Sequence, residues 1–115
     1  MALSEGKGKI LSIYIGESYK YKRNPLYKEI VMLAKKEGLA GATVIRGIEG
    51  FGANSKLRSA DILRLSFDLP VIVKIVDREE KIMKILPKIK EMVNAGLITI
   101  EDVDIIKYSP DGIKE

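Results

Sequence analysis

The densest group of residues that could bind a ligand lies between positions 41 and 58. Its glycines would let backbone N–H groups approach a phosphate without side-chain obstruction. Two basic side chains nearby could add positive charge, and hydroxyl and amide groups could donate or accept hydrogen bonds. The candidate ligand contacts are Thr43, Gly47, Gly50, Phe51, Gly52, Asn54, Ser55, Lys56 and Arg58. Should these basic residues not carry the charge, Lys20, Lys22, Arg46 and Lys107 are the next candidates.

The spacing of these glycines matches neither the phosphate-binding P-loop nor the dinucleotide fingerprint of strand, Gly-x-Gly-x-x-Gly and helix. Taken alone, the residues favour a hairpin loop with glycines at a bulge and a turn. A functional role for Gly50 and Gly52 would require a positive φ or a close approach to a ligand. Phe51 is either an anchor packed on the sheet or a platform for a base.

Two other segments carry groups that could do chemistry. Tyr19 to Arg23 interleaves aromatic and basic residues, a pattern that could stack on a base and neutralise phosphates. A solvated loop whose tyrosines lean on the fold is the preferred interpretation. Glu101, Asp102 and Asp104 could attract a cation, but no ligand set converges in the sequence, and a turn before a strand is preferred.

The residue types that are missing exclude much chemistry. The 115 residues include no Cys and no His, which excludes thiolate nucleophiles, Cys-based zinc sites and His-dependent triads. No carboxylates, lysines or tyrosines are spaced to replace them. We therefore expect no enzyme, no catalytic residue, no metal site and no required cofactor. The net charge of +4 suits phosphate-bearing small ligands at least as well as nucleic acid.

Length and composition indicate one intracellular domain. We expect a flexible lead-in at 1–8, a single domain at 9–108 and a C-terminal tail at 109–115. No segment approaches the ~18 apolar residues of a membrane span, and the start lacks a signal-peptide core. The absence of Cys fits a reducing cytoplasm. The bias toward 17 Ile with no Gln leans toward a thermophilic source.

Hydrophobic periodicity predicts the order β-α-β-β-α-β, a ferredoxin-like α+β fold with a four-stranded antiparallel sheet and two helices on one face. The expected elements are strands at Lys9–Glu17, Ala42–Ile48, Val71–Val76 and Leu97–Tyr108 and helices at Pro25–Glu37 and Asp77–Gly96.

Details of these elements are also predicted. Asn24 is expected to cap the first helix and Gly38 to end it. Asp77 and Glu80 resemble a capping box for the second helix, which Pro87 should kink or locally open. The last strand is expected to be one piece or two pieces around Glu101 and Asp102, and Met32, Met83 and Met92 are expected to fill the core.

The face of the sheet away from the helices is expected to be half apolar. Alternation assigns to it Ser12, Tyr14, Ile72, Lys74 and Val76. This mixture is too apolar to be left fully exposed to water and too polar to form a second core. A homo-oligomer packed through the sheets or their edges would cover it.

Three stretches of the chain resemble a known family. GLAGATVIRGIEGFG, with NPLYKEIV before it and LRLSFDLPVIVKIVD after it, closely resembles domain-of-unknown-function family 190, which is related to the PII signalling proteins. The resemblance extends from Lys9 to Tyr108. It implies a ferredoxin-like trimer that binds adenine nucleotides between subunits and reports their binding to a partner through a loop. It places Thr43 near the adenine and the run Gly50–Gly52 at the base of that loop.

The chain also departs from the PII pattern. In place of a glycine- and lysine-containing phosphate loop after the second helix it has only the run Asn94–Ile98, and Lys107 is the nearest substitute for an Arg-x-Arg pair. The loop 53–61 is short and lacks a modifiable tyrosine, and relatives often have His where this chain has Arg58. The resemblance therefore favours AMP or another adenylyl ligand over a triphosphate with magnesium.

The leading hypothesis is a cytoplasmic trimeric sensor that binds an adenine nucleotide and regulates an unidentified protein. The alternative is a structural or interaction trimer without a small-molecule ligand. A third class, RNA binding through the sheet, has the right topology but lacks aromatic residues on the central strands other than Tyr14.

Overall fold

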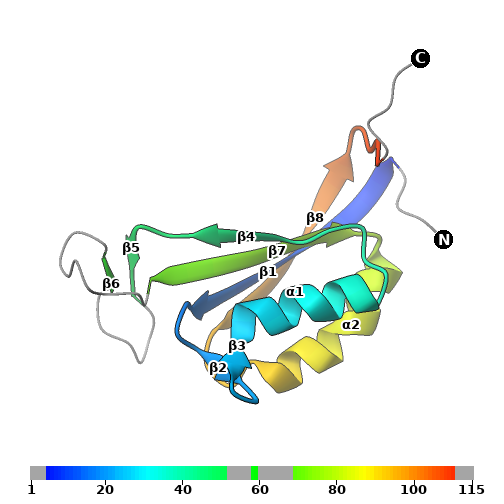
Figure 1. Cartoon of the computed structure of the whole chain (residues 1–115). Coiled ribbons are helices and arrows are strands. Elements are labelled where there is room, and N and C mark those ends of the chain that lie inside the picture. Colours follow the sequence, from blue (N-terminus) through cyan, green and yellow to red (C-terminus); the bar gives the residue numbers. More distant parts are fainter. Residues whose placement is uncertain (1–4, 52–57, 60–68, 111–115) are drawn as a thin grey trace.

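The computed structural model describes residues 5–51, 58–59 and 69–110, and it confirms the predicted α+β fold. A four-stranded antiparallel sheet has the strand order β4-β7-β1-β8, and two helices cross it (Figure 1). The sheet consists of β1 (Gly6–Gly16), β4 (Thr43–Arg46), β7 (Pro70–Asp77) and β8 (Leu97–Ile105). The helices are α1 (Leu26–Lys36) and α2 (Glu79–Met92). Two short hairpins add β2 (Lys20–Tyr21) with β3 (Asn24–Pro25), and β5 (Glu49–Gly50) with β6 (Arg58–Ser59).

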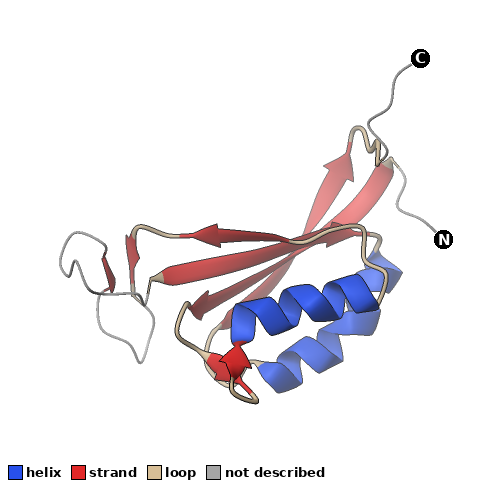
Figure 2. Ribbon diagram, viewed as in Figure 1, coloured by secondary structure: helices blue, strands red, loops and turns tan. Residues whose placement is uncertain are grey.

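Both helices lie on the same face of the sheet, where they form the core (Figure 2). The strands contribute alternate residues to it because successive side chains of a strand point to opposite faces. The helices contribute one apolar stripe each, as their spacing predicts. The buried cluster consists of Leu11, Ile13, Ile15, Leu26, Ile30, Ala34, Val71, Val73, Ile75, Ile82, Ile85, Ile89 and Met92.

The opposite face of the sheet, called here the open face, carries the residues that alternation predicts. Cross-strand register sets two transverse rows on it: Ile45, Ile72, Tyr14 and Leu97 form an apolar row, and Thr43, Lys74, Ser12 and Thr99 form a polar row. Tyr14, Ile45 and Leu97 remain exposed, Leu97 to 56%. No helix among the described residues lies on this side (Figure 2).

The ends of the helices differ from the sequence prediction. Gly38 does end α1, with a φ of +81° that suits glycine. Asn24 does not cap that helix, because it lies in β3; Pro25 occupies the cap position and no side chain caps the helix. The predicted capping box of α2 is also wrong, since Arg78 is its N-cap residue and makes no side-chain cap.

Asp77 has a different role from the one predicted. Its side chain is 1% exposed at the end of β7. One carboxylate oxygen accepts the Ala40 N–H at 2.8 Å and the other accepts the Arg78 N–H at 2.7 Å. A buried carboxylate is tolerated when it is fully hydrogen-bonded. Asp77 thus ties the connection between α1 and β4 to the end of β7.

Two open points about the elements and one expectation about the core are addressed by the structure. α2 runs from Glu79 to Met92 as one α-helix that includes Pro87, and a kink there stays a prediction. Of the two alternatives for the last strand, the structure shows one piece, since β8 continues through Glu101 and Asp102. Met92 is buried, but Met32 and Met83 are 64% and 47% exposed, because they lie on the outer side of their helices.

β1 begins at Gly6, three residues earlier than predicted, because it pairs with the end of β8. In this extension Lys7 donates a hydrogen bond to Asp104 at 2.8 Å, and Lys9 donates one to Asp102. The hydrogen bond to Asp104 raises the pKa of Lys7. The hydrogen bond from Lys9 lowers the pKa of Asp102. The three acidic residues named as a candidate cation site therefore lie in a strand, two of them ion-paired.

Replacing Asp77 with Ala should lower the free energy of unfolding by about 3 kcal/mol, because two buried N–H groups lose a charged acceptor. Urea denaturation followed by circular dichroism measures this change. Asp104→Ala is the matched control, since Asp104 is largely exposed and its removal should leave the midpoint near that of the wild type. Equal midpoints for the two variants would show that the Asp77 carboxylate is not a structural tie.

Candidate ligand-binding site

The candidate residues begin where β4 leaves the sheet and turns into β5. The Gly47 N–H donates to the Pro70 carbonyl oxygen at 2.6 Å. A Cβ at Gly47 would lie 2.9 Å from Cγ of Pro70, and one at Gly50 would lie 3.3 Å from the same atom. Neither glycine has a positive φ. In the structure these glycines therefore allow the backbone to pack closely on Pro70, the first residue of β7.

The segment after Gly47 forms a hairpin ladder. Glu49 pairs with Ser59 and Gly50 pairs with Arg58. This confirms a hairpin for the backbone of this segment and brings Arg58 next to Gly50. Four other candidates lie outside the described residues: Gly52, Asn54, Ser55 and Lys56.

Phe51 follows β5 and is 77% exposed. It therefore does not anchor the loop on the sheet of its own subunit, and of the two interpretations an exposed platform remains. Ile48, three residues earlier, is exposed as well. Two large apolar side chains thus face outward on the segment that carries the candidate glycines.

Thr43 lies at the other end of β4, on the open face. It pairs with Lys74, whereas Gly47 contacts Pro70. Lys74 and Pro70 are four positions apart along β7, which corresponds to roughly 13 Å at about 3.3 Å per residue. Thr43 and the hairpin base therefore lie on one edge of the sheet without touching. A ligand that contacts both would have to extend along that edge.

The charges around this edge are distributed differently from the expectation. Arg46, a reserve candidate for the phosphate contact, forms an ion pair with Glu17 and is largely compensated. Lys74 lies beside Thr43, and it has no ion pair among the described residues. Sequence reasoning placed Lys74 on this face but did not count it as a site residue. A prediction of strand register would have placed Lys74 opposite Thr43 and would have identified it as a neighbour of the site.

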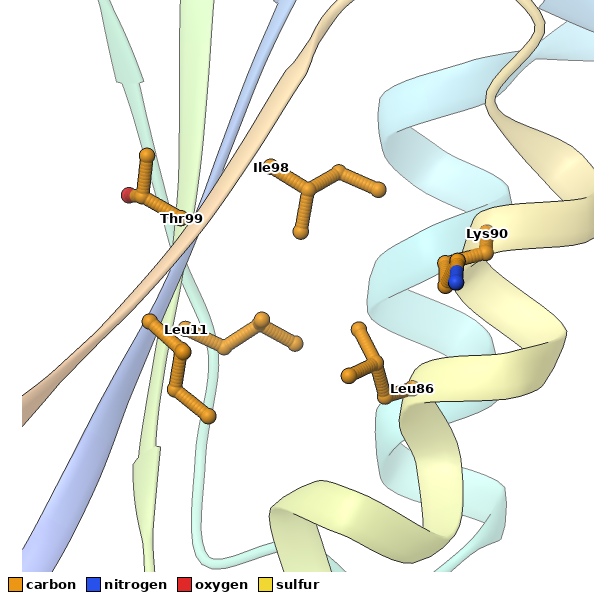
Figure 3. A pocket seen from close by; sticks show the side chains of 6 residues that line it. Leu11, Leu86, Lys90, Ile98 and Thr99 are labelled. Carbon is orange, nitrogen blue, oxygen red and sulfur yellow. The ribbon is translucent and has the colours of Figure 1, made fainter.

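Of the residues named as candidates, only Lys20, a reserve candidate for the phosphate contact, lines one of two recesses in the described part of the chain. The first, about 260 Å³, lies between α2 and the edge strand β8 (Figure 3). Its walls are apolar apart from Lys90 and Thr99, and Leu86 points toward Ile98 across it. The second, about 230 Å³, lies between the β2–β3 hairpin and the connection from α2 to β8. The described candidates of β4 and β5 line neither recess.

Residues 5–51, 58–59 and 69–110 contain neither an acidic metal-binding cluster nor a membrane-spanning helix. No group of three or more acidic side chains there is arranged to hold a metal ion. No helix in those ranges has both the length and the apolarity to cross a membrane.

Comparison with known proteins identifies the family of the chain. The family model DUF190, described as "Uncharacterized ACR", matches residues 8–105. The chain belongs to the DUF190 family. The family resemblance seen in the sequence is thereby confirmed.

Two relatives of this DUF190 chain show how far the similarity extends. The UPF0166 protein MJ1524 of Methanocaldococcus jannaschii is 46% identical over 102 residues, which cover 88% of this chain and 94% of the relative. A UPF0166 protein of Aquifex aeolicus is 44% identical over 100 residues, covering 87% and 94%. Both similarities therefore extend over most of this chain and most of the relative.

Solved structures of a PII-like protein and of a CutA1 protein share the fold of this DUF190 chain. CPII, a nitrogen regulatory PII-like protein from Thiomonas intermedia K12 bound to ADP, AMP and bicarbonate, superposes with a TM-score of 0.62 at 15% identity, covering 92% of this chain and 94% of that one. The divalent ion tolerance protein CutA1 from Ehrlichia chaffeensis gives 0.55 at 11% identity, covering 92% and 88%. At these identities the likeness shows the fold alone.

Gly47→Ala should destabilise this DUF190 protein by about 1–2 kcal/mol, because the new Cβ meets the ring of Pro70 and its carbonyl oxygen. Gly41→Ala is the matched control: a Cβ there meets no heavy atom within 4 Å, and its φ is not positive. That variant should be neutral or slightly stabilised. Urea midpoints compare the two directly. A Gly47→Ala protein as stable as Gly41→Ala would rule out the close packing on Pro70.

Proposed function

We propose that this protein is a cytoplasmic, non-catalytic PII-like regulator that assembles as a homotrimer and binds an adenine nucleotide of the AMP type between copies. The nucleotide state is reported to a protein partner through the segment after β5. One observation carries the proposal: the described candidate contacts lie along one edge of the sheet, with Thr43 and Phe51 exposed, and they line neither of the two recesses of a single copy.

Assembly is supported by the open face. Its apolar row runs across all four strands, with Tyr14, Ile45 and Leu97 exposed. Contiguous apolar surface of this kind marks interaction sites on monomeric chains. Packing of copies through this face or its edges would bury the row and would bring the edge residues of one copy near a second copy.

Nucleotide binding is supported by the residues along β4 and β5. Thr43 offers a hydroxyl group, Phe51 offers an exposed ring for stacking, and the backbone of Gly50 pairs with that of Arg58. The solved CPII structures, which share the fold, are described as bound to ADP and AMP. The net charge of +4 favours an anionic ligand.

A monophosphate is favoured over a triphosphate. The connection between α2 and β8 is only the run from Val93 to Gly96, and it contains no lysine or arginine. Arg46 is engaged by Glu17. The cations assigned to the ligand, Lys56 and Arg58, are sufficient for one phosphate group.

The alternative is a trimer with an interaction role and no small-molecule ligand. It is favoured by the two recesses, since neither is lined by Thr43 or by the described candidates of the β4–β5 segment. An RNA-binding sheet is not proposed, because Tyr14 is the one aromatic residue on the described open face.

Calorimetric titration of AMP, ADP, ATP and adenosine, with and without magnesium, should show AMP binding at least tenfold tighter than adenosine. A charge-assisted phosphate contact contributes about 1.5–3 kcal/mol, which adenosine lacks. ATP should gain little over AMP. Lys56→Ala and Arg58→Ala should weaken AMP binding and leave adenosine binding nearly unchanged, whereas Lys35→Ala, on the exposed side of α1, should change neither.

Two results would contradict parts of this proposal. The absence of heat with all four ligands would favour the trimer without a ligand. ATP binding far tighter than AMP would show that a second group of phosphate contacts exists outside the assigned residues.

A further inference from the structure

The β2–β3 hairpin has an unusual turn. Lys22 and Arg23 occupy its two central positions with φ values of +50° and +74°, and they are the only non-glycine residues with positive φ in the described part of the chain. Two positive φ values are typical of a type I′ turn, for which Asn-Gly is the relaxed sequence. The chain therefore holds two long cationic side chains in a conformation that disfavours them, and backbone outliers of this kind cluster at functional sites.

The cations of this hairpin have no acidic partner in the part of the chain that the structure describes. Lys20, Lys22 and Arg23 are exposed and form no ion pair among these residues. Glu17, the acidic residue just before the hairpin, is engaged by Arg46. The three positive charges fall within four consecutive residues. Within the described residues, the hairpin is therefore a concentrated positive region.

The hairpin is held firmly enough to present these charges. Tyr19 and Tyr21 pack against the core cluster, and the Leu26 N–H donates to the Tyr19 carbonyl oxygen at 2.8 Å. The Lys22 ammonium lies 5.3 Å from the centre of the Tyr21 ring. Since Tyr21 contacts the core and Lys22, it is not a free platform for stacking a base. The chemistry left to the hairpin is charge.

A recess adjoins this positive region. It measures about 230 Å³ and is lined by Tyr19, Lys20, Leu26, Met92, Asn94 and Ala95. It is smaller than the roughly 300 Å³ at which pockets for whole small-molecule ligands begin. It can take one anionic group with a few attached atoms, and Lys20 and Asn94 are the polar residues in its wall apart from Tyr19.

We propose that the β2–β3 hairpin and this recess bind the phosphate group of a small phosphate monoester. A phosphate monoester carries about −1.5 to −2 charges at pH 7, which matches three unpaired cations better than a carboxylate does. Lys20 contacts the phosphate in the recess, and Lys22 and Arg23 raise the positive potential at its entrance. The site is separate from the β4–β5 segment and does not rest on the nucleotide proposal.

The probes are methyl phosphate and acetate, titrated at ionic strength held constant with sodium chloride and followed by backbone amide NMR. Methyl phosphate should shift the amides of 19–26 and 94–95 and bind at least tenfold tighter than acetate. Lys20→Ala should weaken binding at least tenfold. Lys28→Ala, an exposed lysine in the first turn of α1, is the matched control and should bind as the wild type does.

The double variant Lys22→Asn/Arg23→Gly separates a structural role from a binding role. It installs the relaxed turn sequence, so Tm should rise, while methyl phosphate binding should weaken severalfold because two charges are gone. A higher Tm with unchanged binding would overturn the role of these two cations. Shifts confined to other residues, equal affinity for acetate, or tighter binding of a hexaglutamate peptide would overturn the phosphate site, and the last would indicate an acidic protein surface. None of these outcomes depends on whether AMP binds at Lys56 and Arg58.

Discussion

In this structure both helices cover the same face of the sheet, and the other face is left without a helix among the described residues. Right-handed crossovers, the usual form of β-α-β connections, place both helices on one side in this strand order. That side holds Leu11, Ile13, Val73 and Ile75 with no exposed surface. No helix of the described residues covers the open face, so its residues must either tolerate water or meet another part of the molecule or another molecule.

The composition of the open face reflects both demands. Its apolar row consists, in order, of Ile45, Ile72, Tyr14 and Leu97, whereas its polar row contains Lys74. A face that only meets water would not align four large apolar side chains, and a second core would not contain a lysine. The proposed contact with further copies would satisfy both rows, since the apolar row would lose water and the polar row could keep hydrogen bonds.

The ends of the sheet are fixed by polar contacts of the backbone. At one end Asp77 accepts hydrogen bonds from two backbone segments, and at the other the Gly47 N–H bonds to Pro70. These contacts set where β4 begins and leaves the sheet, and hence where Thr43 and Phe51 lie. The candidate site is thus positioned by the frame of the sheet.

Much of this frame could be predicted from sequence, because alternation and helical spacing report burial directly. Leu11 to Ile15, the stripe of α2 and Gly38 were predicted correctly. Asn24 and Asp77 were misassigned as caps, since Asp77 bonds to Ala40, 37 residues away, a contact that local patterns do not contain. The β2–β3 hairpin was missed because its turn has Lys-Arg in place of Asn-Gly. Lys74 was missed as a neighbour of Thr43 because strand register is a tertiary property.

In the proposed assembly the open face and the edges of the sheet meet other copies of the same chain. Native mass spectrometry of freshly purified protein at low micromolar concentration tests this assembly. We expect a complex of three times the chain mass of 12.8 kDa, with additional mass where a nucleotide copurifies. A species of a single chain mass under the same conditions would contradict the assembly and the binding of a nucleotide between copies.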